Sequence, residues 1–251
     1  MHTLKPCLLL GVNDPIASYR SAINENPKNM ANKQTGKVSA RATALNTKFW
    51  NPSRTLTISF MDNPPAALKD AIKALIREWA DYISLPLVFI EGKQGIIRIK
   101  TATDQNASQI GTDALAIDAK EPTLFISSRP TDFDFRTVVL HEFGHALGLH
   151  HEHLHPDANI PWNKAKVYEE YAKKWGMDKN AVDLNLFTPI SEASTITDYD
   201  KTSIMHYPVE KELTDGRFEV PMNTELSHHD KHIVSHLYPV EHSDGGSCER
   251  P

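Results

Sequence analysis

Histidine is concentrated in one short part of this 251-residue chain, because six of its thirteen histidines lie between positions 141 and 155. Residues 141–151 read HEFGHALGLHH. On a helix, His141 and His145 lie about 40° apart around the axis and about 6 Å apart along it, so both imidazoles can reach one ion. Gly148 favours the left-handed conformation that ends a helix and lets His151 turn back to the same ion. The spacing therefore predicts a metal site with three histidine ligands, His141, His145 and His151.

Three protein ligands leave one position of a tetrahedral ion open, which is typical of catalytic rather than structural zinc sites. Glu142, beside the first ligand, can act as a general base on a water in that position. A His-Glu-x-x-His pair alone is a weak signal, but the added glycine and third histidine make it strong. Copper or nickel would also bind three imidazoles, whereas zinc suits a hydrolytic site that needs no redox change. We expect one Zn²⁺ per chain.

Several strands and two helices are expected to position these residues. Alternating apolar and polar residues predict a strand over Arg54–Phe60, and Pro64-Pro65 opens an amphipathic helix that continues to Ile83. Further strands are expected at 85–90, 95–100 and 123–127, with 110–117 as a weaker candidate. The histidines lie on a second helix that starts near Asp134 and runs through Leu147.

The remaining parts of the chain show fewer regular patterns of apolar residues. After residue 155 we expect mostly loops, one helix around Lys164–Lys174 and a last helix that opens at Ser227. Residues 1–46 contain few large apolar residues after Ile23 and are expected to form a loosely held arm or prosegment. The predicted domains are therefore the arm (1–46), a catalytic domain (47–240) and a flexible tail (241–251).

Composition excludes several classes of function. The chain is 40% hydrophobic and 24% charged, with a net charge of −5, which is typical of a globular protein and unlike a binder of nucleic acid or anionic membranes. No apolar stretch is long enough to span a membrane. The two cysteines, Cys7 and Cys248, lie near opposite ends of the chain, so we expect no disulfide framework.

Together, these motifs resemble the astacin-like metzincin zinc metallopeptidases of the bacterial and fungal type. Residues 203–207, Ser-Ile-Met-His-Tyr, are similar to the methionine turn of that family, and Glu152 directly follows His151 as in astacins. The resemblance covers about Phe49 to Tyr238. It implies an α+β metzincin fold: an upper lobe of mixed twisted sheet with two long helices, a loop-rich lower lobe with a C-terminal helix, and a cleft between them.

The resemblance also implies roles for individual residues. Met205 would lie beneath the histidines, and Tyr207 would stabilise the oxyanion while Glu142 transfers the proton. The expected activity is that of a zinc endopeptidase on a protein or peptide substrate, which binds extended along an exposed strand within Ser108–Ile117. We expect a monomer with no nucleic-acid or membrane partner. Glu152 would bind the mature N-terminus, as in animal astacins, or equally well hydrogen-bond to a neighbouring group.

Departures from the family leave alternatives open. Residues 49–247 contain no cysteine, whereas animal astacins have two disulfides there. Asp14 is only a weak counterpart of the aspartate that caps zinc in astacin zymogens, and we interpret Cys7 as a surface thiol of the arm rather than a thiolate lid on the metal. A silent zinc-containing peptide-binding module and a prosegment-inhibited zymogen are the competing functions. Because no convincing signal peptide is found, we expect secretion by another route, as an effector, with a cytoplasmic location as the alternative.

Overall fold

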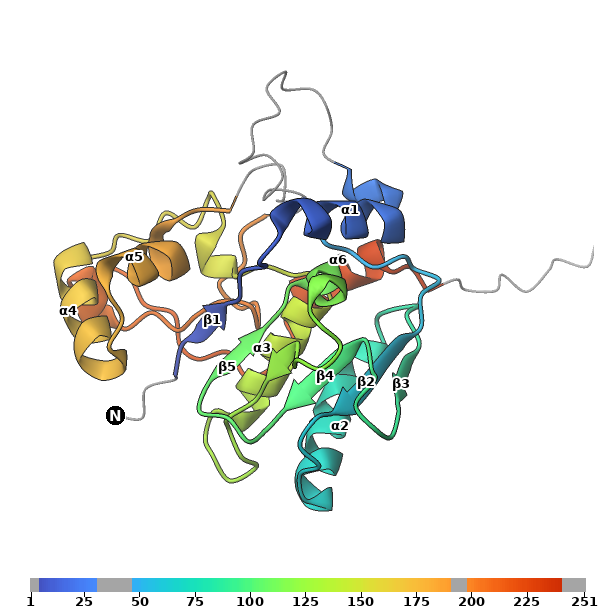
Figure 1. Cartoon of the computed structure of the whole chain (residues 1–251). Coiled ribbons are helices and arrows are strands. Elements are labelled where there is room, and N and C mark those ends of the chain that lie inside the picture. Colours follow the sequence, from blue (N-terminus) through green and yellow to red (C-terminus); the bar gives the residue numbers. More distant parts are fainter. Residues whose placement is uncertain (1–4, 31–46, 191–197, 241–251) are drawn as a thin grey trace, which may run out of the picture.

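A six-stranded mixed sheet is the frame of this computed structural model, which describes residues 5–30, 47–190 and 198–240 (Figure 1). The strands lie in the order β1-β5-β6-β4-β2-β3. The pair β5–β6 is antiparallel, and the other neighbours are parallel. The strands are β1 (Cys7–Leu9), β2 (Leu56–Phe60), β3 (Leu87–Phe89), β4 (Ile97–Lys100), β5 (Asn106–Ser108) and β6 (Leu124–Phe125).

Two long helices pack against each other and the sheet to form the main core. Helix α2 (Ala66–Ala80) buries one apolar side, including Ile72, Ile76 and Trp79, while charged residues cover its other side. Helix α3 (Phe135–Ala146), which carries His141 and His145, is buried along nearly all of its length. The indole of Trp79 donates a hydrogen bond to Leu140 O at 3.3 Å. The predicted helix pair is confirmed, and burial fixes the orientation of α3.

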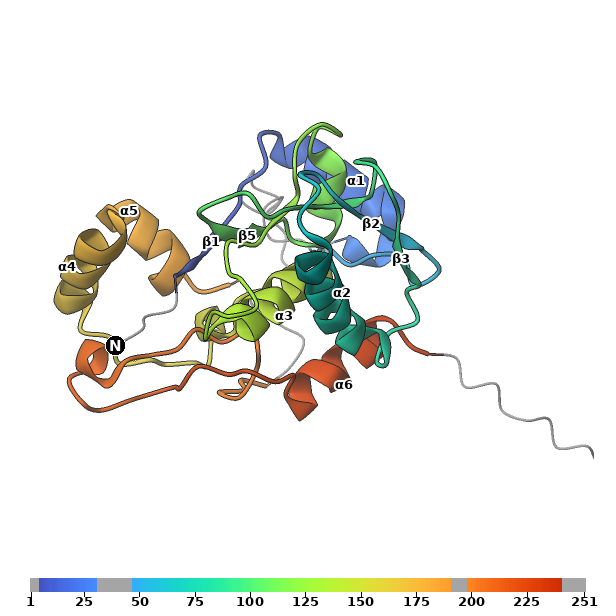
Figure 2. The same cartoon turned by 90° about the horizontal axis from the view of Figure 1, so that it is seen from below.

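A second region lies to one side of the sheet and contains α4 (Lys164–Trp175) and α5 (Lys179–Val182) (Figure 1). A π-helical turn covers Asp183–Phe187, and short 3₁₀ turns cover Glu152–Leu154 and Lys211–Thr214. The last helix, α6 (His228–Leu237), begins with a capping box between Ser227 and Asp230. Helix α6 (Figure 2) contacts the turn that follows α2, since Ser235 Oγ donates a hydrogen bond to Tyr82 O at 3.0 Å. Within the described part of the chain, no helix is both long and apolar enough to cross a membrane.

The described part of the expected loose arm is ordered structure, which corrects the prediction. Residues 5–30, hereafter the N-terminal segment, contain β1, α1 (Pro15–Glu25) and a 3₁₀ turn over Pro27–Asn29. Asp14 caps α1, since its carboxylate accepts hydrogen bonds from the N–H groups of Ile16 and Ala17. The order comes from pairing with distant residues, which composition does not reveal. Residues 31–46 and the predicted tail with Cys248 lie outside the described residues.

The weaker strand prediction over 110–117 is also wrong. Those residues contain a 3₁₀ helix, Gly111–Ala116, against which α1 packs. Its buried positions include Thr112, whose N–H donates to Lys48 O at 3.0 Å, and Ala114. Contact with two distant segments therefore stabilises a turn where the local pattern suggested an extended chain.

Candidate metal centre

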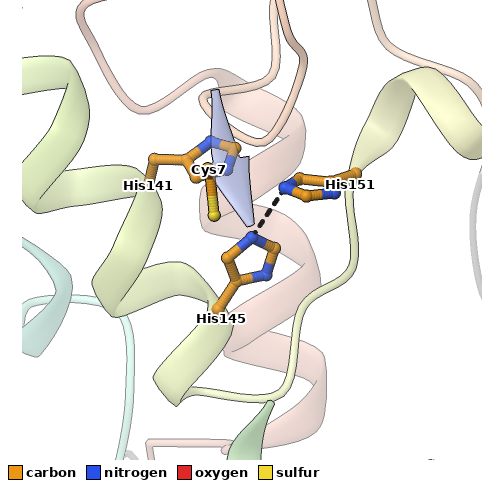
Figure 3. Close-up of side chains that lie close together, drawn as sticks. All are labelled: Cys7, His141, His145 and His151. Carbon is orange, nitrogen blue, oxygen red and sulfur yellow. Dashed lines mark hydrogen bonds between the residues drawn. The ribbon is translucent and has the colours of Figure 1, made fainter. Parts of the chain in front are cut away.

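The three predicted ligands come together in one buried place. Helix α3 carries His141 and His145 one turn apart, and Gly148, at φ 100°, redirects the chain so that His151 returns to them. The centroid of the His145 ring lies 4.7 Å from that of His141 and 4.5 Å from that of His151. Figure 3 shows the three rings converging, with His145 Nε2 and His151 Nε2 3.0 Å apart.

The hydrogen bonds of these rings suit metal ligation. His141 Nδ1 lies 2.8 Å from Ile204 O, and His145 Nδ1 lies 2.8 Å from Leu149 O. When each Nδ1–H donates a hydrogen bond to its carbonyl, each Nε2 keeps a free lone pair that faces the cluster. Backbone carbonyls orient histidine ligands in this way in many metal sites. His141 Nε2 is buried without a hydrogen-bond partner. An ion bound there would satisfy it, so the donor set fits zinc.

Burial also favours the neutral form of the imidazoles. Desolvation lowers the pKa of His141 to about 4 and holds the pKa of His145 and His151 well below the ordinary value. Neutral imidazole is the form that binds a metal ion, because the lone pair must be free. The site is thus prepared for ligation near neutral pH.

The methionine turn lies directly against the ligand helix. Met205 is buried, and a Cβ added at Gly144 would collide with its Sδ atom. Asp230 of α6 secures this turn, accepting hydrogen bonds from Ser203 Oγ at 2.7 Å and from Ile204 N at 2.8 Å. The residue pattern at 203–207 predicted the turn, but the contact of Asp230 with it was not expected. The Ser227-x-x-Asp230 pattern indicates a helix start, and only the fold shows that the same carboxylate also holds the turn.

Glu142 lies beside the cluster and is almost completely buried, at 1% exposure. Desolvation raises its pKa to about 8, which a hydrogen bond from Cys7 partly opposes. A carboxyl group with such a pKa can accept and release a proton near neutral pH. The sequence-predicted base is therefore adjacent to the predicted ligands.

The expectation that Cys7 is a surface thiol is wrong. Cys7 is buried, and its Sγ atom and one nitrogen from each of the three histidines all lie within 4.8 Å of one another (Figure 3). Its Sγ also donates to Glu142 Oε2 at 3.2 Å. Burial raises the pKa of the thiol, whereas coordination to zinc would deprotonate it. The arrangement offers a metal ion three nitrogens and one sulfur.

Strand pairing brings Cys7 to this position. Strand β1 pairs in parallel with β5, and Cys7 is opposite Asn106. Tyr207, which follows the methionine turn, donates its hydroxyl hydrogen bond to Cys7 O, and its ring centroid lies 4.6 Å from that of His151. The N-terminal segment therefore covers an edge of β5, which overlaps the expected substrate strand within Ser108–Ile117 only at Ser108. Most of that expected strand is instead the 3₁₀ helix Gly111–Ala116. The N-terminal segment also engages both predicted catalytic side chains.

The remaining sequence candidates have other partners. Glu152 accepts a hydrogen bond from Asp200 N at 2.8 Å, and its own N–H donates to Met205 O at 3.0 Å. This agrees with the alternative that its carboxylate binds a neighbouring group. Burial raises the Glu152 pKa to about 7. Asp14, the weak candidate for capping zinc, caps α1 instead.

Comparisons with known proteins agree with this geometry. The family model described as Astacin, a peptidase family, matches residues 42–233. A solved structure titled "Structure of myroilysin" is 36% identical, covers 78% of this chain and 97% of its own, and has a TM-score of 0.72. Another, "Crystal structure of myroilysin", is 30% identical, covers 92% and 100% of the two chains, and has a TM-score of 0.60.

A more distant match is a zinc-protease hatching enzyme, high choriolytic enzyme 1 from Oryzias latipes (Medaka fish). It is 17% identical, covers 80% of this chain and 97% of its own, and has a TM-score of 0.53. At that identity the likeness concerns the fold alone. The comparison with curated proteins gave no match.

Proposed function

Since this chain belongs to the astacin family of zinc metallopeptidases, we propose that it is an endopeptidase that cleaves peptide bonds within protein substrates. The observation that carries the proposal is the convergence of His141, His145 and His151 beside the buried carboxyl group of Glu142. A silent peptide-binding module has no need of a buried acid with a raised pKa at this place. No observation favours that alternative.

His141, His145 and His151 would hold the zinc ion. When bound, zinc supplies a Lewis acid that polarises a carbonyl and lowers the pKa of a water. Glu142 Oε2 takes a proton from the attacking water and then delivers it to the leaving nitrogen. The Tyr207 hydroxyl, whose pKa burial raises well above the ordinary value, stays protonated and donates to the oxyanion that forms on the scissile carbonyl.

The substrate would bind as an extended chain along β5. An exposed strand edge offers backbone hydrogen bonds to a substrate of any sequence, and β1 already uses that edge in the present arrangement. A substrate must therefore replace β1. Because one chain supplies every residue named here, we propose that the active unit is a monomer.

We also propose that the N-terminal segment keeps the enzyme latent. Cys7 would occupy the fourth coordination position, β1 covers the substrate edge, and the carbonyl of Cys7 engages the Tyr207 hydroxyl. These three contacts use the groups that the reaction requires. A cut within residues 31–46 would free the segment to leave.

The activity is tested with casein and a random peptide library, using the full chain after limited proteolysis within residues 31–46. We expect cleavage that 1,10-phenanthroline abolishes and added Zn²⁺ restores, because chelation removes the ion. Mass spectrometry of the products locates the cuts. Peptide binding without cleavage by the zinc-loaded protein would instead support the silent module.

Latency is tested with Cys7→Ala in the full, uncut chain. We expect activity to rise at least about tenfold over the wild-type chain, since one lost contact worth about 1.4 kcal/mol shifts the closed state by that factor. Gly11→Ala is the matched control in the same segment, because a Cβ there meets nothing within 4 Å. Equal activities of Cys7→Ala and wild type would contradict the role of the thiol.

For localisation, we propose export by a route independent of a signal peptide and action as an effector inside another cell. A latent peptidase would not harm the cell that makes it, which supports this proposal. Secretion of the full chain is compared with that of a variant lacking residues 241–251. Retention of the shortened chain is expected, and unchanged export would contradict a transport signal in the tail.

A further inference from the structure

His153 is a buried histidine to which the proposed function gives no role. It lies in the 3₁₀ turn Glu152–Leu154, two residues after the third ligand, and only 4% of its surface is exposed. Its Nδ1 atom is buried and has no hydrogen-bond partner among the described residues. Burying a polar atom without a partner costs free energy, which an apolar side chain of similar size would avoid. The contacts of the ring must therefore offset this cost.

One edge of the His153 ring is fixed by the second region. His153 Nε2 lies 2.8 Å from Asn185 O, and the nitrogen is the donor because a carbonyl oxygen can only accept. Asn185 belongs to the π-helical turn Asp183–Phe187, and such turns are rare and frequent at functional sites. Beyond this turn, Ile190 N donates to Leu154 O at 2.9 Å. Two hydrogen bonds thus join the turn that carries His153 to the chain around Asn185.

The face of the His153 ring lies against Tyr207. The two ring centroids are 4.3 Å apart and the ring planes differ by 24°, so the rings are stacked. The Tyr207 ring also meets the proposed ligand His151, with centroids 4.6 Å apart and planes at 58°. Stacked and tilted contacts of this kind favour particular ring orientations. The phenol ring is therefore held from two directions, by a proposed ligand and by His153.

The hydroxyl of Tyr207 has a different partner in the latent arrangement. It donates to Cys7 O, a contact that is lost when β1 leaves the edge of β5. The backbone of the tyrosine keeps its own contact, because Tyr207 O lies 2.6 Å from His206 Nδ1. That contact does not fix the tilt of the ring. Once β1 has left, the stack on His153 is a contact that can still orient the phenol.

We propose that His153 is a positioning residue for Tyr207. Because its edge is fixed at Asn185 O, the imidazole holds the phenol ring at one tilt and aims the hydroxyl at the oxyanion. The inference rests on the proposed peptidase function and adds to it a residue that acts only through Tyr207. A donor stabilises the oxyanion best when its orientation is fixed in advance, and a displacement of about 1 Å can lower a rate by about 10²-fold.

The first test is a double-mutant cycle in the zinc-loaded full chain that carries Cys7→Ala. His153→Ala should lower kcat by about 10- to 10²-fold and change KM by less than about twofold, because the oxyanion forms only in the transition state. In the Tyr207→Phe background, which has no hydroxyl to aim, the same change should alter kcat by less than about twofold. His153→Phe keeps a ring for the stack and should retain kcat within about threefold.

His155→Ala is the matched control for this cycle. His155 follows the same 3₁₀ turn and is 5% exposed, but its ring lies against Tyr199, with centroids 6.0 Å apart. We expect a much smaller change in kcat, and full zinc content in every variant by mass spectrometry. The proposal would be overturned by an equal loss in His155→Ala, by an equal loss in the Tyr207→Phe background, or by loss of zinc in His153→Ala.

The second test needs no cleavage and so separates this inference from the peptidase function. Lack of zinc-dependent cleavage by the Cys7→Ala chain would contradict the peptidase function alone. Fluorine NMR of the same chain labelled with 3-fluorotyrosine follows the Tyr207 ring, whose signal is identified by its loss in Tyr207→Phe. We expect a sharp signal in the parent and in His153→Phe, and a shifted, broadened signal in His153→Ala. An unchanged Tyr207 signal in His153→Ala would overturn the inference.

Discussion

The metal-ligand region and the N-terminal segment meet at Cys7, but different contacts hold them. The ligand helix α3 is buried within the main core, and its histidines are fixed by carbonyls of Leu149 and Ile204. The N-terminal segment instead lies on the outside of β5 and of the 3₁₀ helix Gly111–Ala116. A buried helix cannot leave without unfolding the core, whereas an added strand can.

Polar contacts hold the N-terminal segment at a second place, away from the metal centre. Ser18 accepts a hydrogen bond from Lys48 Nζ at 2.5 Å and donates one to Asp113. Lys48 Nζ also lies 3.0 Å from Asp113 Oδ1. The cover is thus attached at Cys7 and again at Ser18. This difference shows that a site fixed within the core and a segment that can leave it can both contribute side chains to one buried metal centre.

Replacing the proposed base should give the largest effect. In the Cys7→Ala full chain, Glu142→Gln is expected to lower kcat by about 10²–10⁴-fold, because the amide cannot accept the proton. Zinc content, measured by mass spectrometry, should not change, since Glu142 is not a proposed ligand. Glu91→Gln, at an exposed position, is the control. Near-normal turnover in Glu142→Gln would contradict its assigned role.

Removing the support of the methionine turn should have the next largest effect. Asp230→Ala leaves the buried Ser203 hydroxyl and Ile204 N–H without their acceptor. We expect a loss of about 2–4 kcal/mol in the free energy of unfolding, measured by urea denaturation. Asp215→Ala, at an exposed turn, should change stability far less. Equal losses in both variants would show that Asp230 does not support the turn.

Adding a methyl group at Gly144, and separately at Gly11, compares how tightly the metal-ligand region and the N-terminal segment are packed. Gly144→Ala would push against Met205 Sδ and should cost about 1–3 kcal/mol of stability through overpacking. The same change at Gly11, in the N-terminal segment, meets no atom within 4 Å and should cost little. Thermal denaturation of both variants provides the measurement. A larger effect at Gly11 would reverse the comparison.

The smallest expected effect concerns the second attachment of the segment. Ser18→Ala removes the hydrogen bonds to Lys48 and Asp113 and should weaken closure by about 1 kcal/mol. Residual activity of the uncut chain is then expected to rise about fivefold. Tyr19→Ala, at a partly exposed neighbouring position, provides the comparison. If Ser18→Ala left the residual activity unchanged, the hydrogen bonds of Ser18 to Lys48 and Asp113 would not contribute to closure.

Local spacing predicted the parts of the site that lie on one short stretch of chain. The one-turn separation of His141 and His145 and the glycine at 148 place three imidazoles together with little help from distant residues. Helices α2, α3, α4 and α6 were likewise expected, because each has a regular apolar side or a clear start signal. The 3₁₀ helix at 111–116 was missed because its contacts come from Lys48 and α1.

The sequence by itself determined the histidine spacing, the neighbouring glutamate and the methionine turn, because a helix and a tight turn fix these relations over a few residues. Only the tertiary structure decided that Cys7, which is 134 residues before His141, lies at the same centre. It also decided that Asp230 holds the turn. Such contacts depend on how strands and helices pack, and no local pattern encodes which distant residue fills a given position.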